Sequence, residues 1–140
     1  MASDNLRMIR REDWPERLIE AIGTHAGLPF EWGISDCFLL PMDCVLAMTD
    51  TDPWWEERGY TSAAGAAKRL RRHGFASVAD AFAAKFEEIP PTLAGRGDIG
   101  VIETPDGLAG VVFMDTGAIG KAEAGVRRVA RSLVVRAFKV

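Results

Sequence analysis

The sequence contains very little cysteine and histidine, with two of each among 140 residues. Cys37 and Cys44 stand seven residues apart in one apolar run. On a helix that spacing separates them by about 10 Å, too far for a disulfide bond. The scattered cysteines and histidines also lack the spacing of a zinc site. We therefore expect no disulfide, no metal and no cofactor.

Long apolar segments are absent as well. No uncharged run reaches the roughly 18 apolar residues that a membrane-spanning helix needs, so no membrane span is expected. The first residues do not join a basic segment to an apolar one, so we expect no signal peptide and synthesis in the cytoplasm. Internal repeats and low-complexity tracts are also missing, which excludes repeat architectures.

An excess of positive charge is missing too. The net charge is −3, which argues against a protein that neutralises many phosphates, so nucleic acid is not an expected partner. Basic residues gather toward the C-terminus, as Lys121, Arg127, Arg128, Arg131, Arg136 and Lys139. Such a cluster is typical of a solvated sheet face or of a docking face for an acidic partner.

The residues that are present fit an ordinary globular protein. Hydrophobic residues make up 48% and charged residues 26%, and this length suffices for one core. We expect one domain over residues 1–140, with an N-terminal arm (1–11), a helical half (12–88) and a β meander (96–140). The break between the halves falls at Ile89-Pro90-Pro91. Helices first and antiparallel strands second define the α+β class.

Capping residues and apolar spacing locate the individual elements. The first helix begins near Asp13 and ends at Gly27, with His25 in its last turn as a cation at the negative helix end. Further helices are expected over residues 37–48, 61–74 and 77–86, with a short helical turn over 52–59. Alternating apolar residues and turns predict strands over residues 98–103, 108–115, 119–122, 126–129 and 136–140, with a helical turn over 130–135.

One stretch, Trp32-Gly33-Ile34-Ser35-Asp36-Cys37, precedes a run that is apolar on nearly every side of a helix. Such a helix is buried, and Ser35 or Asp36 can cap it. Cys37 would then face unpaired backbone N–H groups and the positive end of the helix dipole, which lowers the pKa of a thiol. Cysteine hydrolases present their nucleophile in this way.

A structural interpretation stands beside the catalytic one. A free cysteine is among the most frequently buried residue types and usually serves as a small apolar side chain. Cys44, in the middle of the apolar run, fits that description. For Cys37 the residues alone leave both interpretations open.

The motif Trp32-Gly33-x-x-Asp36-Cys37, followed about sixty residues later by Arg96-Gly97-Asp98-Ile99, resembles the NlpC/P60 branch of the papain-like fold. The resemblance implies Cys37 as nucleophile, Asp36 as the residue that caps the helix and orients the thiol, and a Gly-Asp element that opens the sheet. It also implies that Trp32, Gly33 and Asp98 belong to the cleft or to the scaffold of the motif.

The chain from Phe30 to Val140 is more similar still to a phage-associated group of that superfamily, the DUF6950 type. The further shared elements are Asp52-Pro53, Arg58-Gly59-Tyr60-Thr61 and Gly65. This resemblance implies a cell-wall peptidase-like protein made in the host cytoplasm and located in the virion at the tail tip. Its partners would be other tail-tip or hub proteins, and host peptidoglycan.

One departure from the NlpC/P60 pattern bears on activity. Those enzymes carry a catalytic histidine on the second strand of the sheet, where this sequence has Leu108 or Ala109, and no histidine follows His73. A thiol without a base or a general acid attacks amides poorly. We therefore favour a degenerate, structural or plugging module in which Cys37 is vestigial. The alternative is an active cysteine peptidase or amidase that cleaves host peptidoglycan during genome delivery.

Overall fold

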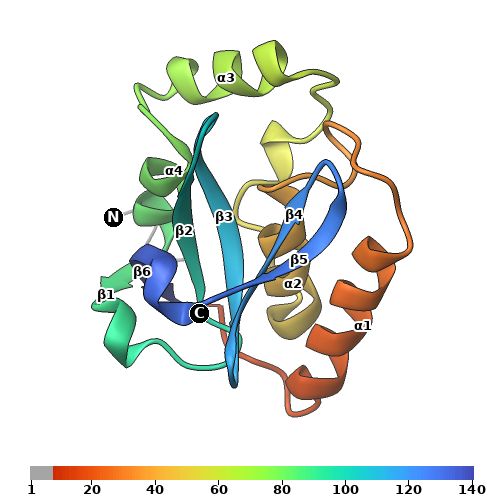
Figure 1. The fold of residues 1–140 in the computed structure, drawn as a ribbon, viewed down its shortest axis with the longest axis vertical. Coiled ribbons are helices and arrows are strands. Elements are labelled where there is room, and N and C mark those ends of the chain that lie inside the picture. The colour runs from red at the N-terminus through yellow and green to blue at the C-terminus, as the bar shows by residue number, and fades with distance from the viewer. Residues whose placement is uncertain (1–7) are drawn as a thin grey trace.

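The structure, a computed structural model, describes residues 8–140 (Figure 1). Helices occupy the first part of this range and strands the second, as the sequence predicts for an α+β fold. The helical elements are α1 (Trp14–Ala26), α2 (Leu39–Thr49), the 3-10 turn η2 (Trp55–Glu57), α3 (Ala63–Arg72) and α4 (Val78–Lys85). The expected arm lies partly outside the described residues; residues 8–11 form neither helix nor strand.

The strands form one antiparallel sheet with the order β1-β6-β2-β3-β4-β5. They are β1 (Glu87–Ile89), β2 (Ile99–Thr104), β3 (Gly107–Met114), β4 (Gly117–Ala122), β5 (Gly125–Val129) and β6 (Val134–Lys139). Strands β2 to β5 follow one another as the predicted meander. The last strand departs from it, because β6 crosses back and inserts between β2 and β1.

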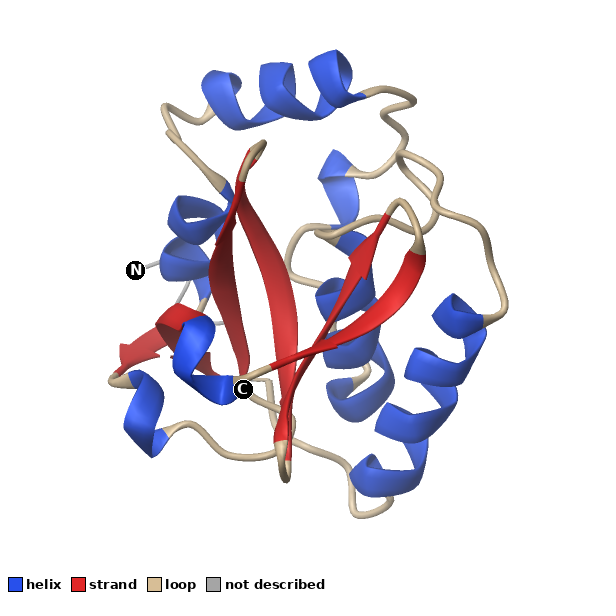
Figure 2. Cartoon of the chain, viewed as in Figure 1, coloured by secondary structure: helices blue, strands red, loops and turns tan. Residues whose placement is uncertain are grey.

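Side chains of the sheet alternate between two apolar layers. On β3, Val112 packs into the main core against α2 and α4, while Val111 and Phe113 face a smaller cluster on the opposite side. Short 3-10 turns, η3 (Pro91–Leu93) and η4 (Arg131–Leu133), cover that opposite side. Helices α2 and α4 contact the sheet, and α1 packs on α2, as Figure 2 shows with helices in blue and strands in red.

Two boundaries differ from the expectations. Helix α2 begins at Leu39 rather than at Cys37, because Cys37 and Phe38 form a turn beneath the Asp36 carboxylate. Strand β1 falls at the end of the expected helical half. Its three residues are too few to show an alternation of apolar and polar side chains, and the strand is held by its pairing with β6. The expected burial of α2 is confirmed, since its residues are buried almost throughout.

Asp98 lies in a clamp at the start of the sheet. Its Oδ1 accepts hydrogen bonds from the Arg10 guanidinium (3.1 Å) and from the Val140 backbone N–H (2.9 Å). Oδ2 accepts from the Gly95 N–H (2.8 Å). The Arg-Gly-Asp motif therefore fastens both ends of the described chain to the first long strand.

Among residues 8–140, no helix has the length and apolar character needed to cross a membrane.

Candidate functional site

The loop before α2 is built around the buried carboxylate of Asp36. Oδ1 accepts hydrogen bonds from the backbone N–H groups of Phe38 (2.9 Å) and Leu39 (2.8 Å). Asp36 therefore makes the predicted capping contacts, although Phe38 occupies the N-cap position of α2 itself. Oδ2 accepts from the Gly33 N–H (2.9 Å) and from the Tyr60 hydroxyl (2.7 Å). Four donors thus satisfy a carboxylate that has no exposed surface. Its hydrogen-bonding capacity is filled before any substrate arrives.

Tyr60 connects this loop to the segment that follows η2. Its hydroxyl donates to Asp36, and its backbone carbonyl lies against Gly33. Burial and then the neighbouring Asp36 charge raise the pKa of Tyr60, so the hydroxyl stays a donor. The Arg58-Gly59-Tyr60 motif, in the sequence only a pattern shared with the DUF6950 type, therefore includes this buried contact.

Strand β3 passes directly beside Cys37. A Cβ added to Gly110 would lie 2.6 Å from the Cys37 carbonyl oxygen, so glycine allows the sheet to approach the start of α2. Leu108 is on the same face of β3 as Gly110 and packs into the main core, whereas Ala109 faces the other way. At the expected position of the histidine, the strand therefore presents an apolar side chain to the helices.

The expected lowering of the Cys37 pKa is wrong. Burial first, and the adjacent Asp36 carboxylate second, raise the pKa of the thiol from 9.0 to about 11. The backbone N–H groups of Gly110 and Cys37 act in the opposite direction but do not compensate. Desolvation outweighs the helix end because Cys37 is covered by β3 and lies next to a carboxylate. At neutral pH the thiol is protonated.

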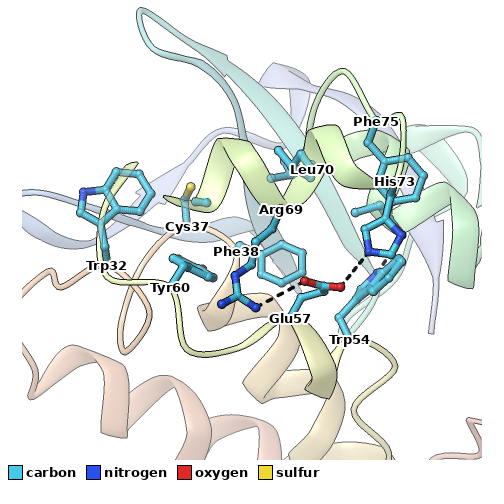
Figure 3. Close-up of a pocket in the computed structure, with 13 residues that line it drawn as sticks. Trp32, Cys37, Phe38, Trp54, Glu57, Tyr60, Arg69, Leu70, His73 and Phe75 are labelled. Atoms are coloured by element: carbon cyan, nitrogen blue, oxygen red, sulfur yellow. Dashed lines mark hydrogen bonds and ion pairs between the residues drawn. The ribbon is translucent and has the colours of Figure 1, made fainter. Parts of the chain in front are cut away.

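Cys37 lines one end of an apolar pocket of about 70 Å³ (Figure 3). The walls come from the loop before α2, the segment around η2, helix α3 and the start of α4. The lining residues are Trp32, Cys37, Phe38, Trp54, Glu57, Tyr60, Ala66, Arg69, Leu70, His73, Phe75, Val78 and Ala81. Trp54, buried and hydrogen-bonded to the Ala81 carbonyl oxygen (2.9 Å), forms the floor between helices.

Charged residues close the opposite end of the pocket. The Glu57 carboxylate accepts a hydrogen bond from His73 Nε2 (2.8 Å) and another from Arg69 (3.4 Å). The His73 ring also stacks on Phe75, at 5.2 Å between ring centroids. Figure 3 shows His73 and Cys37 at opposite ends, with Phe38 and Arg69 between them. The pocket therefore contains a thiol and an imidazole, but it keeps them apart.

His25 takes part in a separate, buried network. Its Nδ1 shares a hydrogen bond with Ser35 Oγ (2.7 Å), and its Nε2 donates to Asp43 (2.7 Å). Arg58 continues the chain of contacts, bonded to Asp43 and to Asp52 at 2.6 Å each. Ser35 has no exposed surface and His25 is 2% exposed, so this Ser-His-Asp set has no access to substrate. It ties α1, α2 and the η2 segment together.

The cation at the C-terminal end of α1 is Lys121 and not the expected His25. His25 points into the network just described, while Lys121 on β4 donates to the carbonyl oxygens of His25 (2.5 Å) and Leu28 (2.6 Å). Lys121 therefore does not belong to an exposed basic face. Arg131, which contacts the carbonyls of Pro91 and Ala94, is also engaged internally. Arg136 pairs with Glu88 (2.8 Å).

The candidate residues named from the sequence separate into two places. Trp32 and Cys37 line the pocket, and Asp36 and Gly33 form the buried support behind them. Asp98 is part of the clamp and does not line the pocket. Over the described residues, no cluster of histidine, cysteine and acidic side chains has the composition of a metal site.

Fold and site together define an α+β protein with an apolar pocket that a half-buried thiol lines. Over residues 9–140 the chain matches the model of a family described as a domain of unknown function, DUF6950, and it belongs to that family. No curated protein and no solved structure matches the chain.

Proposed function

We propose that this protein is a structural component of a phage tail tip, with a papain-like frame of the NlpC/P60 kind that no longer carries out hydrolysis. The similarity of the Trp-Gly-x-x-Asp-Cys and Arg-Gly-Asp motifs to that superfamily supports the frame. The resemblance to the phage-associated DUF6950 type supports the location. The observation that carries the non-catalytic part is the passage of β3 beside Cys37. There the strand offers the Gly110 backbone and Leu108, neither of which accepts or donates a proton in catalysis.

Electrostatics at Cys37 support the same proposal. A nucleophilic thiol needs a base or a lowered pKa, and this thiol has a raised one. Both ring nitrogens of His25 are occupied by Ser35 and Asp43. A plugging or scaffolding role needs neither an activated thiol nor an available imidazole, because it depends on shape and on docking to tail-tip or hub proteins.

The alternative, a cysteine peptidase that cleaves host peptidoglycan, is favoured by one observation. Cys37 and His73 line the same pocket, and His73 has an acidic partner in Glu57, as a catalytic histidine requires. A movement that brought the two ends of the pocket together would create a thiol-imidazole pair.

Digestion of host peptidoglycan by the full chain, beside a Cys37→Ala variant, separates the two functions. We expect no release of muropeptides from either protein. Release that depends on Cys37 would establish the peptidase and refute the structural proposal. Antibody labelling of intact particles in the electron microscope tests the location independently, with label expected at the tail tip and not on the capsid.

A further inference from the structure

Helix α3 stands apart from the other helices and forms the roof of the pocket. It crosses one end of the molecule in Figure 1, and none of its residues is buried. Three of its side chains, Ala66, Arg69 and Leu70, line the pocket. The helix is thus held mainly by what it covers, since it contributes no fully buried residue to the core.

The Glu57 carboxylate holds the C-terminal end of α3 in place. Glu57, on η2, accepts from Arg69 within α3 and from His73 just after it. These contacts, first of all the hydrogen bond from His73, lower the pKa of Glu57, so the carboxylate is charged at neutral pH. Its side chain is 20% exposed, which leaves the two contacts accessible to water and easily exchanged.

Glycines stand on both sides of α3. Gly59 and Gly74 have φ angles of +102° and +75°, which other residues rarely adopt. A Cβ at Gly74 would meet no atom within 4 Å, and at Gly59 only the end of the Arg69 side chain. Glycine has more backbone freedom than any other residue, so these two turns are the points about which a movement of the segment would pivot.

We propose that α3 is a movable lid and that the pocket beneath it binds a small, uncharged aromatic molecule. Rings of Trp32, Phe38, Trp54 and Phe75 line the space, and aromatic edges and faces attract a further ring. A charged ligand finds no free partner, because Glu57 is already paired with Arg69 and His73. Binding at this pocket does not depend on the tail-tip role proposed above.

The pocket is small for such a ligand. Its volume of about 70 Å³ is roughly half that of an engineered cavity of about 150 Å³ that takes up benzene. A ring is therefore enclosed completely only when α3 moves outward to admit it. Opening breaks the contacts of Glu57, and closing over the ligand restores them.

Indole is the probe of the pocket. Its binding is monitored through the amide NMR chemical shifts of the full chain. We expect saturable shifts confined to residues at the pocket, including Cys37 and Leu70. Ala66→Trp fills the pocket and should abolish them, while Ala64→Trp on the exposed side of the same helix should leave them unchanged. The absence of shifts, or shifts that persist in Ala66→Trp, would overturn the ligand site. A pocket that accepts only a side chain of a partner protein would give no shifts with indole.

Alkylation of Cys37 by iodoacetamide, followed by peptide mass mapping, tests the lid. Glu57→Gln should raise the rate at least fivefold, and Arg69→Gln should raise it less, because one contact remains. Glu56→Gln is the matched control on the exposed neighbour and should have no effect. Indole should slow the reaction in the unaltered protein. Equal alkylation rates in all four proteins would show that the Glu57 contacts do not control an opening of α3.

Discussion

Gly33 and Tyr60 approach so closely that a Cβ on Gly33 would lie 1.8 Å from the Tyr60 carbonyl oxygen. The φ angle of Gly33 is +83°, a conformation that side chains disfavour. The loop before Cys37 and the segment after η2 are therefore locked together by backbone, not only by the Tyr60–Asp36 hydrogen bond. Two motifs separated by more than twenty residues form one structural unit.

Replacement of Gly33 by alanine should disrupt this unit. The methyl group requires movement of the Tyr60 backbone in addition to an unfavourable φ, so we expect a loss of at least about 2 kcal/mol in the free energy of unfolding. Urea denaturation followed by tryptophan fluorescence measures it. Gly23→Ala is the control: Gly23 lies in α1 with no atom near its Cβ position, and alanine there should stabilise by about 0.5–1 kcal/mol. Equal effects of the two changes would refute the close approach.

Tyr60→Phe removes one of the four donors to Asp36. A hydrogen bond to a charged acceptor contributes about 1.5–3 kcal/mol, and we expect a loss in that range. Asp36→Asn should lower the free energy of unfolding more than Tyr60→Phe does, because the amide NH2 of asparagine would face N–H or O–H donors. In the double variant the losses should not add, since both act on one contact. Additive losses would mean that the hydroxyl does not depend on the carboxylate.

The reactivity of Cys37 should follow its raised pKa. Only the thiolate is alkylated, so the rate should rise about tenfold per pH unit above neutrality and reach half its maximum near pH 11. A short peptide with the same residues around the cysteine provides the reference near pH 9. A half-maximal rate at or below that of the peptide would restore the interpretation of Cys37 as an activated nucleophile.

The same pKa shift predicts a loss of stability in alkali. Above about pH 9 the unfolded chain releases the Cys37 proton while the folded chain keeps it, so the unfolded state binds fewer protons and stability falls as pH rises. This contribution is complete below pH 9 and is lost as the pH rises through about 11. Cys44, whose pKa is also raised by burial, acts in the same direction. Urea denaturation at pH 8 and pH 10.5 should show a smaller difference for Cys37→Ala than for the unaltered protein.

Lys121→Met should weaken the attachment of α1 to the sheet. The side chain is 4% exposed and bonds the carbonyl oxygens of His25 and Leu28. Methionine keeps the apolar stem but leaves both carbonyls without the cation, which should cost about 2–3 kcal/mol. Lys139→Met, at an exposed position on β6, should change stability by less than about 0.5 kcal/mol. Similar losses for both would contradict the buried role of Lys121.

Local sequence signals predicted most of the elements, because caps and periodicity act over a few residues. Ser62 and Ser77 cap α3 and α4, each through its side-chain oxygen, at the starts of two of the expected helices. The turns at Gly107 and Gly117 separate the predicted strands. Strand β1 was missed because it has only three residues, and its stability comes from β6, some fifty residues away. No local pattern contains that information.

The site was predicted less well, for the same physical reason. The cap by Asp36 was evident from its position, but the pKa of Cys37 depends on how much of the chain covers it. The neighbour Gly110 is more than seventy residues away in sequence. Lys121 illustrates the limit most clearly, since a charged residue in a basic cluster is ordinarily exposed. Only the packing of β4 against the end of α1 shows that this one is not.

The position of β6 between β1 and β2 has a consequence for the integrity of the sheet. Strands β1 and β2 do not pair with each other, because each pairs with one side of β6. Without residues 134–139, β1 would have no partner and β2 would expose an unpaired edge, which is a template for aggregation. A single strand therefore protects the sheet from association with other chains.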